Sequence, residues 1–498
     1  MTRITCLFVL AICLGLTEKT SGQTVSYAAG AFGQPATSET SFEERLQAIE
    51  DENARLRSES IQLRAETDRL RELIDSSEIN NVGDIEQTSF LTPSPHSCDG
   101  CRDCGETNRE GPLGRFCFEE MAWKKGNGWK IVPFGRLRAD YIYSSAAYTN
   151  DAVIVFLNPR SPGISEDSTS LTAKQSQINF ALTGPTYQGW ETGGIVLINF
   201  MGQQPLRNFS GANIVLAYGE IKNDEWRVAF GRMLDLFGPI NSTTVNQMQH
   251  RGAGNIGIYR GALNIDRYLT LSDTHKWTLS GRISQPDISD YAAVPLINGQ
   301  NNGWPNIEAR VGVELGATQE FGRPIEVGIS GVVGELQAVL PAIAGGLILP
   351  GADETIQVGG ACIDAQIRGE IFGFRGEVWW GKSAGTYFVA SLQSINPETD
   401  QAIESVGGWA EIYCNLTSCL KTHVGYGLDD PRNDDLGFLD ITGPGQISFN
   451  DVAWWNVIYN VTDHFEVGLE VSHRRTRFLQ SANDNEGTQC HVSTAFNF

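Results

Sequence analysis

The C-terminal stretch Gln489–Phe498, which reads QCHVSTAFNF, decides the fold class. Its side chains alternate in character. One set is Cys490, Val492, Thr494, Phe496 and Phe498, and the other is Gln489, His491, Ser493, Ala495 and Asn497. Successive side chains of a β-strand point to opposite faces, so one face of this strand can contact lipid while the other contacts water. The pattern predicts the last strand of an antiparallel transmembrane β-barrel.

The composition supports strands rather than membrane helices. The chain has 498 residues, 41% of them hydrophobic, with 54 glycines and a formal net charge of -22. These values suit many short strands and turns, and the acidity excludes a nucleic-acid partner, which would need a basic surface. No apolar run after the N-terminus reaches the roughly 20 residues of a membrane-spanning helix. The nearest, Ala338–Leu349, is interrupted by Pro341, Gly345 and Gly346 and is expected to be a loop.

The N-terminus resembles a cleaved secretory signal. Met1-Thr2-Arg3 precedes the apolar run Ile4–Leu16, and small residues end the segment at Gly22. We therefore expect residues 1–22 to be a signal peptide and the mature chain to be exported. A membrane anchor is the alternative, but this run is too short to span a bilayer. A lipid attachment site at Cys13 is another alternative, which the bulky Ile12 before it disfavours.

A coiled coil is expected at residues 41–75, after a flexible segment at 23–40. Apolar residues recur over five heptads, at d as Phe42, Ile49, Leu56, Leu63 and Leu70, with Leu46, Asn53, Ser60, Thr67 and Ile74 at a. An isolated helix would leave this stripe exposed to water. The segment Arg45–Glu50 resembles a motif of three-stranded coiled coils, in which Arg45 and Glu50 would pair between helices around Leu46 and Ile49. Asn53 at an a position instead favours a dimer; a trimer is the preferred prediction.

Residues 76–128 are expected to form a linker with a cysteine-rich insert. Cys98, Cys101 and Cys104 fall within CDGCRDC, and Cys117 follows. This spacing can bind zinc, but an exported chain meets an oxidising environment, so disulfides are favoured and a metal site stays an alternative. Cys414 and Cys419 are close enough in sequence to form a bridge.

Residues 129–498 are expected to form the barrel. In the segment 130–143, Ile131, Leu137 and Tyr141 oppose Arg138 and Asp140, and similar alternation recurs near 307–315 and 465–472. Further strand-length segments occur near 177–182, 194–201, 212–220, 226–233, 259–271, 276–283, 325–336, 356–368, 370–380, 407–414, 422–428 and 452–460. With the terminal segment they predict about 16 strands, enough to enclose an aqueous lumen.

A soluble β-sandwich also alternates and is the alternative fold. Aromatic residues near strand ends favour a barrel, because Tyr and Trp settle at lipid interfaces. They are Trp129, Tyr141, Tyr143, Trp226, Trp379, Trp380, Trp454 and Trp455.

The chain resembles the trimeric outer-membrane porins, and most closely the DcaP-like group, which carries an N-terminal coiled coil. The resemblance covers the architecture as a whole. Its local motifs are the opening strand PFGRLRADYIY, the stretch GRMLDLFGPINSTTVNQ and the terminal STAFNF. It implies a homotrimer in the bacterial outer membrane with a periplasmic coiled coil, and Phe496 and Phe498 as part of the signal for the barrel-assembly machinery. The cysteine-rich insert departs from the family pattern.

The resemblance also implies a loop that folds into the lumen and narrows it. The matching position is Leu234–Ala253, and the alternative is an external loop. The candidate constriction residues are Asp235, Asn241, Asn246, Gln247, Gln249, His250 and Arg251. Strand alternation separately predicts pore-lining charges at Arg136, Arg138, Asp140, Arg227, Arg310, Arg368 and Arg375, with Glu308, Glu314, Glu377, Glu466 and Glu470 on the same face.

These features predict passive diffusion of small hydrophilic solutes, with a slight preference for anions from Arg136, Arg138, Arg227 and Arg251. Diffusion through water needs no cofactor, and we expect none. A structural tether is the alternative: the coiled coil would extend about 50 Å and could reach peptidoglycan. An enzyme is not expected, because neither HExxH nor GxSxG occurs.

Overall fold

The computed structural model describes residues 123–125, 128–148, 154–161, 163, 165–202, 211–286, 303–318, 322–339, 342–344, 347–349, 353–396, 398–399, 401–438 and 445–498. The expected signal peptide, the coiled coil with Arg45, Leu46, Ile49 and Glu50, and the cysteine-rich insert all lie outside these residues. They remain predictions.

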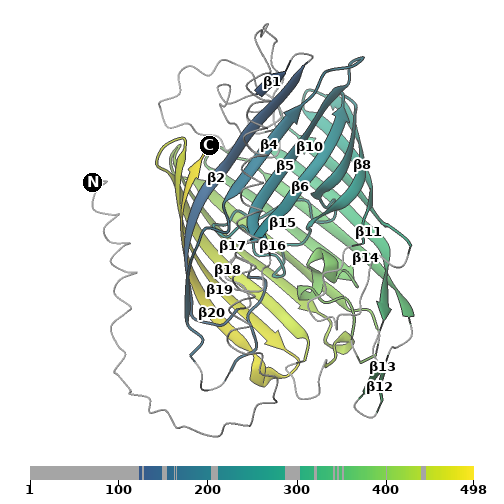
Figure 1. Ribbon diagram of the computed structural model, residues 1–498, viewed down its shortest axis with the longest axis vertical. Coiled ribbons are helices and arrows are strands. Elements are labelled where there is room, and N and C mark those ends of the chain that lie inside the picture. The colour runs from purple at the N-terminus through teal and green to yellow at the C-terminus, as the bar shows by residue number, and fades with distance from the viewer. Residues whose placement is uncertain are drawn as a thin grey trace, which may run out of the picture. The chain divides into compact units, whose positions relative to one another are not determined.

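One closed antiparallel sheet forms the wall of a barrel (Figure 1). Its strands are β2 (Trp129–Ser144), β3 (Ser168–Thr172), β4 (Gln177–Thr183), β5 (Glu191–Gly202), β6 (Gly211–Lys222), β7 (Trp226–Leu234), β8 (Tyr259–Ser272), β9 (His275–Ser284), β10 (Asn306–Leu315), β11 (Ile325–Val339), β14 (Asp353–Ile367), β15 (Phe372–Lys382), β16 (Glu404–Asn415), β17 (Leu420–Pro431), β18 (Ile447–Asn460), β19 (Phe465–Phe478) and β20 (Asn485–Asn497). β3 and β4 pair with successive halves of β2 and share one position in the wall. The wall therefore has 16 positions, which confirms the predicted number.

The barrel closes where its first and last strands pair. β2 and β20 are antiparallel from Arg136 opposite Asn497 to Ser144 opposite Gln489. Gly135 and the terminal Phe498 exchange two main-chain hydrogen bonds, at 2.9 and 3.0 Å. In Figure 1 the blue β2 lies beside the yellow C-terminal strands. A closed ladder leaves no strand edge with unpaired backbone groups.

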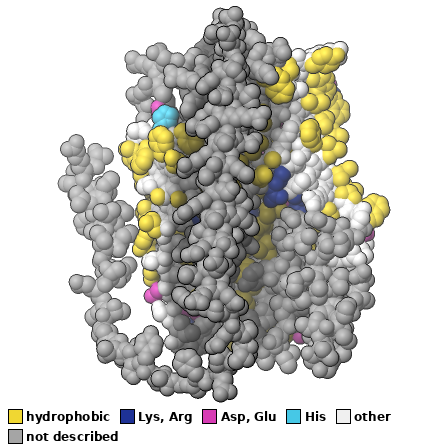
Figure 2. Space-filling model, in the orientation of Figure 1, with side chains coloured by type: hydrophobic (Ala, Val, Ile, Leu, Met, Phe, Trp, Pro, Cys, Tyr) yellow, Lys and Arg dark blue, Asp and Glu magenta, His cyan; other side chains and the backbone are white. Residues whose placement is uncertain are grey.

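The wall has an apolar outer face and a mainly polar inner face. Outer side chains such as Ile329, Ile363 and Val378 are more than half exposed, whereas the alternating Asp364 and Glu377 are buried. Figure 2 shows hydrophobic side chains along both visible flanks of the wall. This arrangement is opposite to that of a soluble sandwich, and it confirms the barrel prediction.

Three details differ from the sequence predictions. The stretch expected to be a loop contains a short hairpin, β12 (Ala342–Ala344) paired with β13 (Leu347–Leu349). A short strand, β1 (Trp123–Lys125), falls inside the expected linker and pairs with the start of β2. Cys414 carries a free thiol, so the expected bridge to Cys419 is wrong. No helix among the described residues is long and apolar enough to cross a membrane.

Because β2 pairs with strands on both sides at Gly135, a side chain at this position should not be tolerated. A Cβ at this position would lie 2.3 Å from the carbonyl oxygen of Gln177 and 2.9 Å from the ring of Phe498, so Gly135→Ala should destabilise the barrel by about 1–3 kcal/mol. Gly281→Ala is the matched control, because a Cβ there meets nothing within 4 Å. Urea midpoints and heat-dependent gel mobility measure the difference. Equal stability of the two variants would contradict this account of closure.

Candidate pore constriction

Hydrogen bonds join the two ends of the loop 235–258, which connects β7 to β8. The Asp235 N–H donates to the Ile258 carbonyl, and the Ile258 N–H donates back to the Asp235 carboxylate, both at 2.9 Å. Arg260 contacts the same carboxylate at 2.7 and 3.0 Å. Burial raises the pKa of Asp235 to about 6, although Arg260 acts in the opposite direction. These contacts hold the first and last residues of the loop side by side, so the segment between them must leave the wall.

Four glutamates on the inner wall hold this loop by its main chain. Each accepts one backbone N–H: Glu308 from Leu236 at 2.7 Å, Glu377 from Ile240 at 2.9 Å, Glu411 from Thr243 at 2.8 Å and Glu470 from Val245 at 2.7 Å. These carboxylates lie on β10, on the neighbouring strands β15 and β16, and on β19, with two further strands on each side between the β15–β16 pair and the other two. Only a segment that crosses the interior can contact all of them. We call residues 235–258 the inner loop.

The inner loop also contacts the wall through side chains. Trp379 donates its indole N–H to the Gly254 carbonyl at 2.6 Å, and Gln247 donates to the Gln175 carbonyl at 2.7 Å. Gly254 has a φ of +98°, and a Cβ there would lie 2.1 Å from the Gly408 carbonyl oxygen. The loop therefore packs directly on the backbone of the wall.

All the predicted constriction residues lie on the inner loop, and most of them bond within it. Arg251 donates to the Gly257 carbonyl and to the side chains of Gln249 and Asn241, at 2.6–2.8 Å. Asn246 accepts from the Met248 N–H at 2.9 Å. These contacts shape the loop. Whether the same side chains also line the path of a solute stays a prediction.

His250 lies in a buried cluster against β18 and β19. Its ring is 4.8 Å from that of Trp454 and its Nδ1 is 3.4 Å from Arg474. Burial lowers the pKa of His250, and the nearby Arg474 lowers it further. The imidazole is therefore neutral at pH 7 and contributes no charge to the lumen.

The predicted pore-lining arginines are almost all neutralised by carboxylates. Arg138 pairs with Asp140 at 2.6 Å, Arg227 with Glu220 at 2.6 Å and Asp266 at 2.9 Å, Arg310 with Asp364 at 2.5 Å, Arg368 with Glu326 at 2.8 Å, and Arg375 with Glu411 at 2.9 Å. Arg136 differs, since no described carboxylate lies within ion-pair distance of it. It is the predicted cation with the least local compensation.

A second segment between β15 and β16, residues 383–396, also folds inward, although no sequence pattern indicated it. Tyr387 is fully buried, its hydroxyl lies 3.2 Å from Glu308, and its carbonyl accepts from the Gly257 N–H at 2.9 Å. Five non-glycine residues here have positive φ: Ser383, Phe388, Ala390, Ser391 and Leu392. Such backbone has no strong sequence signal, so periodicity could not have found it.

Two of the predicted interface aromatics face the interior instead. Trp379 and Trp454 are 4% and 3% exposed. Each directly precedes an outer tryptophan, Trp380 or Trp455, and strand alternation sends neighbours to opposite faces. The inner member of each pair contacts the inner loop.

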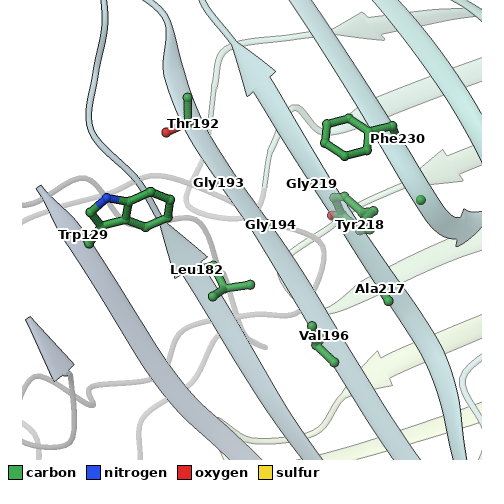
Figure 3. Close-up of a pocket in the computed structure, with 11 residues that line it drawn as sticks. Trp129, Leu182, Thr192, Gly193, Gly194, Val196, Ala217, Tyr218, Gly219 and Phe230 are labelled. Atoms are coloured by element: carbon green, nitrogen blue, oxygen red, sulfur yellow. The ribbon is translucent and has the colours of Figure 1, made fainter. Parts of the chain in front are cut away.

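An apolar groove of about 410 Å³ lies on the outer wall and is separate from the constriction. Trp129 and Phe230 stand on either side of it, and Gly193, Gly194 and Gly219 leave the backbone bare between them (Figure 3). Its lining carries no charged group. Among the described residues, no three His, Cys, Asp or Glu side chains come together as a metal site.

If the wall glutamates hold the inner loop in place, removing one of them should make the loop more accessible to protease. Glu470→Ala would leave the buried Val245 N–H without its acceptor, at a cost of about 1–3 kcal/mol. Trypsin should then cleave after Arg251, which is 3% exposed in the intact protein. Glu314→Ala is the control, because Glu314 is also on the inner face but pairs with Lys276 at 3.3 Å, away from the loop. Resistance to trypsin in both variants would refute the anchoring role.

Comparisons with known proteins agree with this geometry. No protein-family model and no curated protein matches the sequence. Among solved structures, the outer membrane channel DcaP of Acinetobacter baumannii is 15% identical, with 76% of this chain and 99% of that chain covered at a TM-score of 0.60. An anion-selective porin from Comamonas acidovorans, at 11% identity, covers 74% and 100% with a TM-score of 0.47. The chain has the fold of the outer-membrane porins.

Proposed function

We propose that the protein is an outer-membrane porin through which small hydrophilic solutes diffuse passively. The observation that carries the proposal is a closed wall of 16 strands, apolar outside and charged inside, with a loop held across its interior. A wall of this size is wide enough for water. Solutes crossing in water keep their hydration, so the width and charge of the constriction decide which of them pass.

The ion pairs argue for modest charge selectivity. Arg138, Arg227 and Arg310 each face a carboxylate, so their fields largely cancel within a few ångströms. Arg251 is used within the inner loop. The proposed slight preference for anions therefore depends chiefly on Arg136.

We further propose a homotrimer in the bacterial outer membrane, with residues 41–75 as a periplasmic coiled coil around Arg45, Leu46, Ile49 and Glu50. Outer-membrane lipid would contact the apolar wall. The barrel-assembly machinery would recognise the end of β20, where Phe496 is exposed on the outer face. Disulfides among the N-terminal cysteines belong to this proposal too.

Channel activity is tested in planar bilayers with purified protein. We expect stepwise increases of current in groups of three, because each trimer would insert three pores together. Single steps would contradict the trimer but keep the channel. A complete absence of conductance from correctly folded protein would reject the channel itself.

Charge selectivity is tested at Arg136. One charge acting over about 10 Å of water contributes about 0.4 kcal/mol, so Arg136→Gln should lower the anion-to-cation permeability ratio roughly twofold. Arg267→Gln removes an equal charge beside Glu225 at the outer rim and is the control. Reversal potentials across a salt gradient give the ratio. An unchanged ratio in Arg136→Gln would remove this residue from the selectivity mechanism.

A structural tether is the second candidate, favoured by the five heptads of residues 41–75. The two roles are separated by deleting residues 42–74. A tether predicts loss of co-sedimentation with peptidoglycan while single-channel conductance is kept. If the deletion leaves co-sedimentation unchanged, the coiled coil is not the attachment.

A further inference from the structure

The lumen beside β11, β14 and β15 is filled by an apolar core. Phe237 of the inner loop and Tyr387 of segment 383–396 are both fully buried in it. The inward side chains that these strands contribute are Leu336, Val358 and Trp379, each at most 4% exposed. Protein interiors packed in this way have no room for a continuous path of water. Solutes cannot pass along this part of the wall.

Two glycines of the wall admit the two inward segments. A Cβ on Gly360 of β14 would lie 2.6 Å from the ring of Phe237 on the inner loop. A Cβ on Gly381 of β15 would lie 2.8 Å from Val389 on segment 383–396. Any larger residue at either position would push one segment away from the wall. The inner face of β14 and β15 is therefore shaped to receive both segments.

Arg260 joins the two segments. It lies on β8, two residues after the inner loop, and is 1% exposed. Its guanidinium donates to both carboxylate oxygens of Asp235, at 2.7 and 3.0 Å, and to the Thr386 carbonyl at 3.0 Å. It also lies 3.7 Å from the centroid of the Tyr387 ring, a cation–π contact. A buried charge that loses one of its partners is costly. Neither segment can therefore move away from Arg260 without a penalty.

Tyr387 makes the matching contacts from the other segment. Its carbonyl accepts from the Gly257 N–H at 2.9 Å, and its ring packs edge-on against Phe237 with the centroids 5.5 Å apart. Its hydroxyl donates at 3.2 Å to Glu308, the carboxylate that accepts the Leu236 N–H. The main chain, the ring and the hydroxyl of this residue thus each contact the inner loop or its anchor.

We propose that Arg260 and Tyr387 lock the inner loop and segment 383–396 into one constriction, so that solutes pass only on the side away from β11, β14 and β15. Segment 383–396 carries no charged side chain. It therefore limits the size of a solute and not its charge. The effect on solute size rests on the proposed channel function, whereas the locking of the two segments depends only on the fold.

Limited trypsin digestion of the folded, full-length protein tests the lock. Tyr387→Ala alters only segment 383–396, yet cleavage after Arg251 on the inner loop should become roughly fivefold faster, because the loop opens more often. Arg260→Gln should act in the same way. Arg260→Lys keeps the charge but loses the planar group, and its cleavage rate should lie between those of Arg260→Gln and the unaltered protein.

Ser383→Ala is the matched control for the trypsin test. Ser383 is fully buried on the same segment, and its hydroxyl has no hydrogen-bond partner among the described residues, so cleavage after Arg251 should not change. Cleavage after Arg138, inside β2, reports general unfolding. An unchanged rate after Arg251 in Tyr387→Ala would overturn the lock. Equal acceleration after Arg251 and Arg138 would overturn it too, because the whole barrel would then have loosened.

Swelling of proteoliposomes in neutral sugars tests the effect on solute size. In Tyr387→Ala the rate for a trisaccharide relative to a monosaccharide should rise roughly twofold, because a wider constriction favours the larger solute. Ser383→Ala should keep the ratio of the unaltered protein. Variants are compared only where the barrel keeps its heat-dependent gel mobility; if Tyr387→Ala does not fold, Tyr387→Phe removes the hydroxyl contact alone and should shift both measurements in the same direction.

The two measurements separate the lock from the channel. Faster trypsin cleavage with an unchanged sugar ratio would keep the lock and reject the role in solute size. If the unaltered protein admits no sugar and conducts no ions, the proposed channel fails and the role in solute size fails with it. The trypsin result still decides whether the two segments are joined.

Discussion

The pairing of β2 with β20 is the interaction on which the rest of the structure depends. A sheet with an apolar outer face cannot leave backbone donors and acceptors open at an edge, because hydrocarbon offers them no partner. The two hydrogen bonds between Gly135 and Phe498 extend the ladder to the last residue of the chain. Once the wall is closed, its polar side chains have only the interior in which to lie. The charged lumen is therefore a result of closure as much as of composition.

The interior shows how a barrel can fix a loop without matching its side chains. Glu308, Glu377, Glu411 and Glu470 accept main-chain N–H groups, so the loop's position is independent of which side chains it carries at those points. The carboxylates used in this way are not free to act on passing ions. Much of the formal charge on the inner face therefore holds the loop in place. The number of inward-facing Asp and Glu residues overstates the electric field that a solute in the lumen experiences.

The sequence predicted the wall well because alternation is a local signal that strand geometry converts directly into two faces. It predicted the inner loop through family resemblance, since nothing in residues 235–258 by itself states that they turn inward. It failed where the outcome depends on distant partners. Trp379 and Trp454 were predicted to lie at the lipid interface, but the strand register places both on the inner face. Glu308 and Glu470 were predicted to be pore-lining charges, but both accept hydrogen bonds from the inner loop.

The five non-glycine residues with positive φ in 383–392 make this segment dependent on its partners. Left-handed backbone costs an L-residue roughly 1–2 kcal/mol, so an isolated segment would abandon this shape. Two hydrogen bonds stabilise it: the Ser391 N–H donates to the Asp429 carboxylate on β17, and the Gln393 side-chain amide donates to the Ile447 carbonyl on β18. Both strands follow this segment in the chain. Residues 383–392 therefore hold their conformation only when β17 and β18 are in place, so this part of the lumen depends on strands that follow it in the chain.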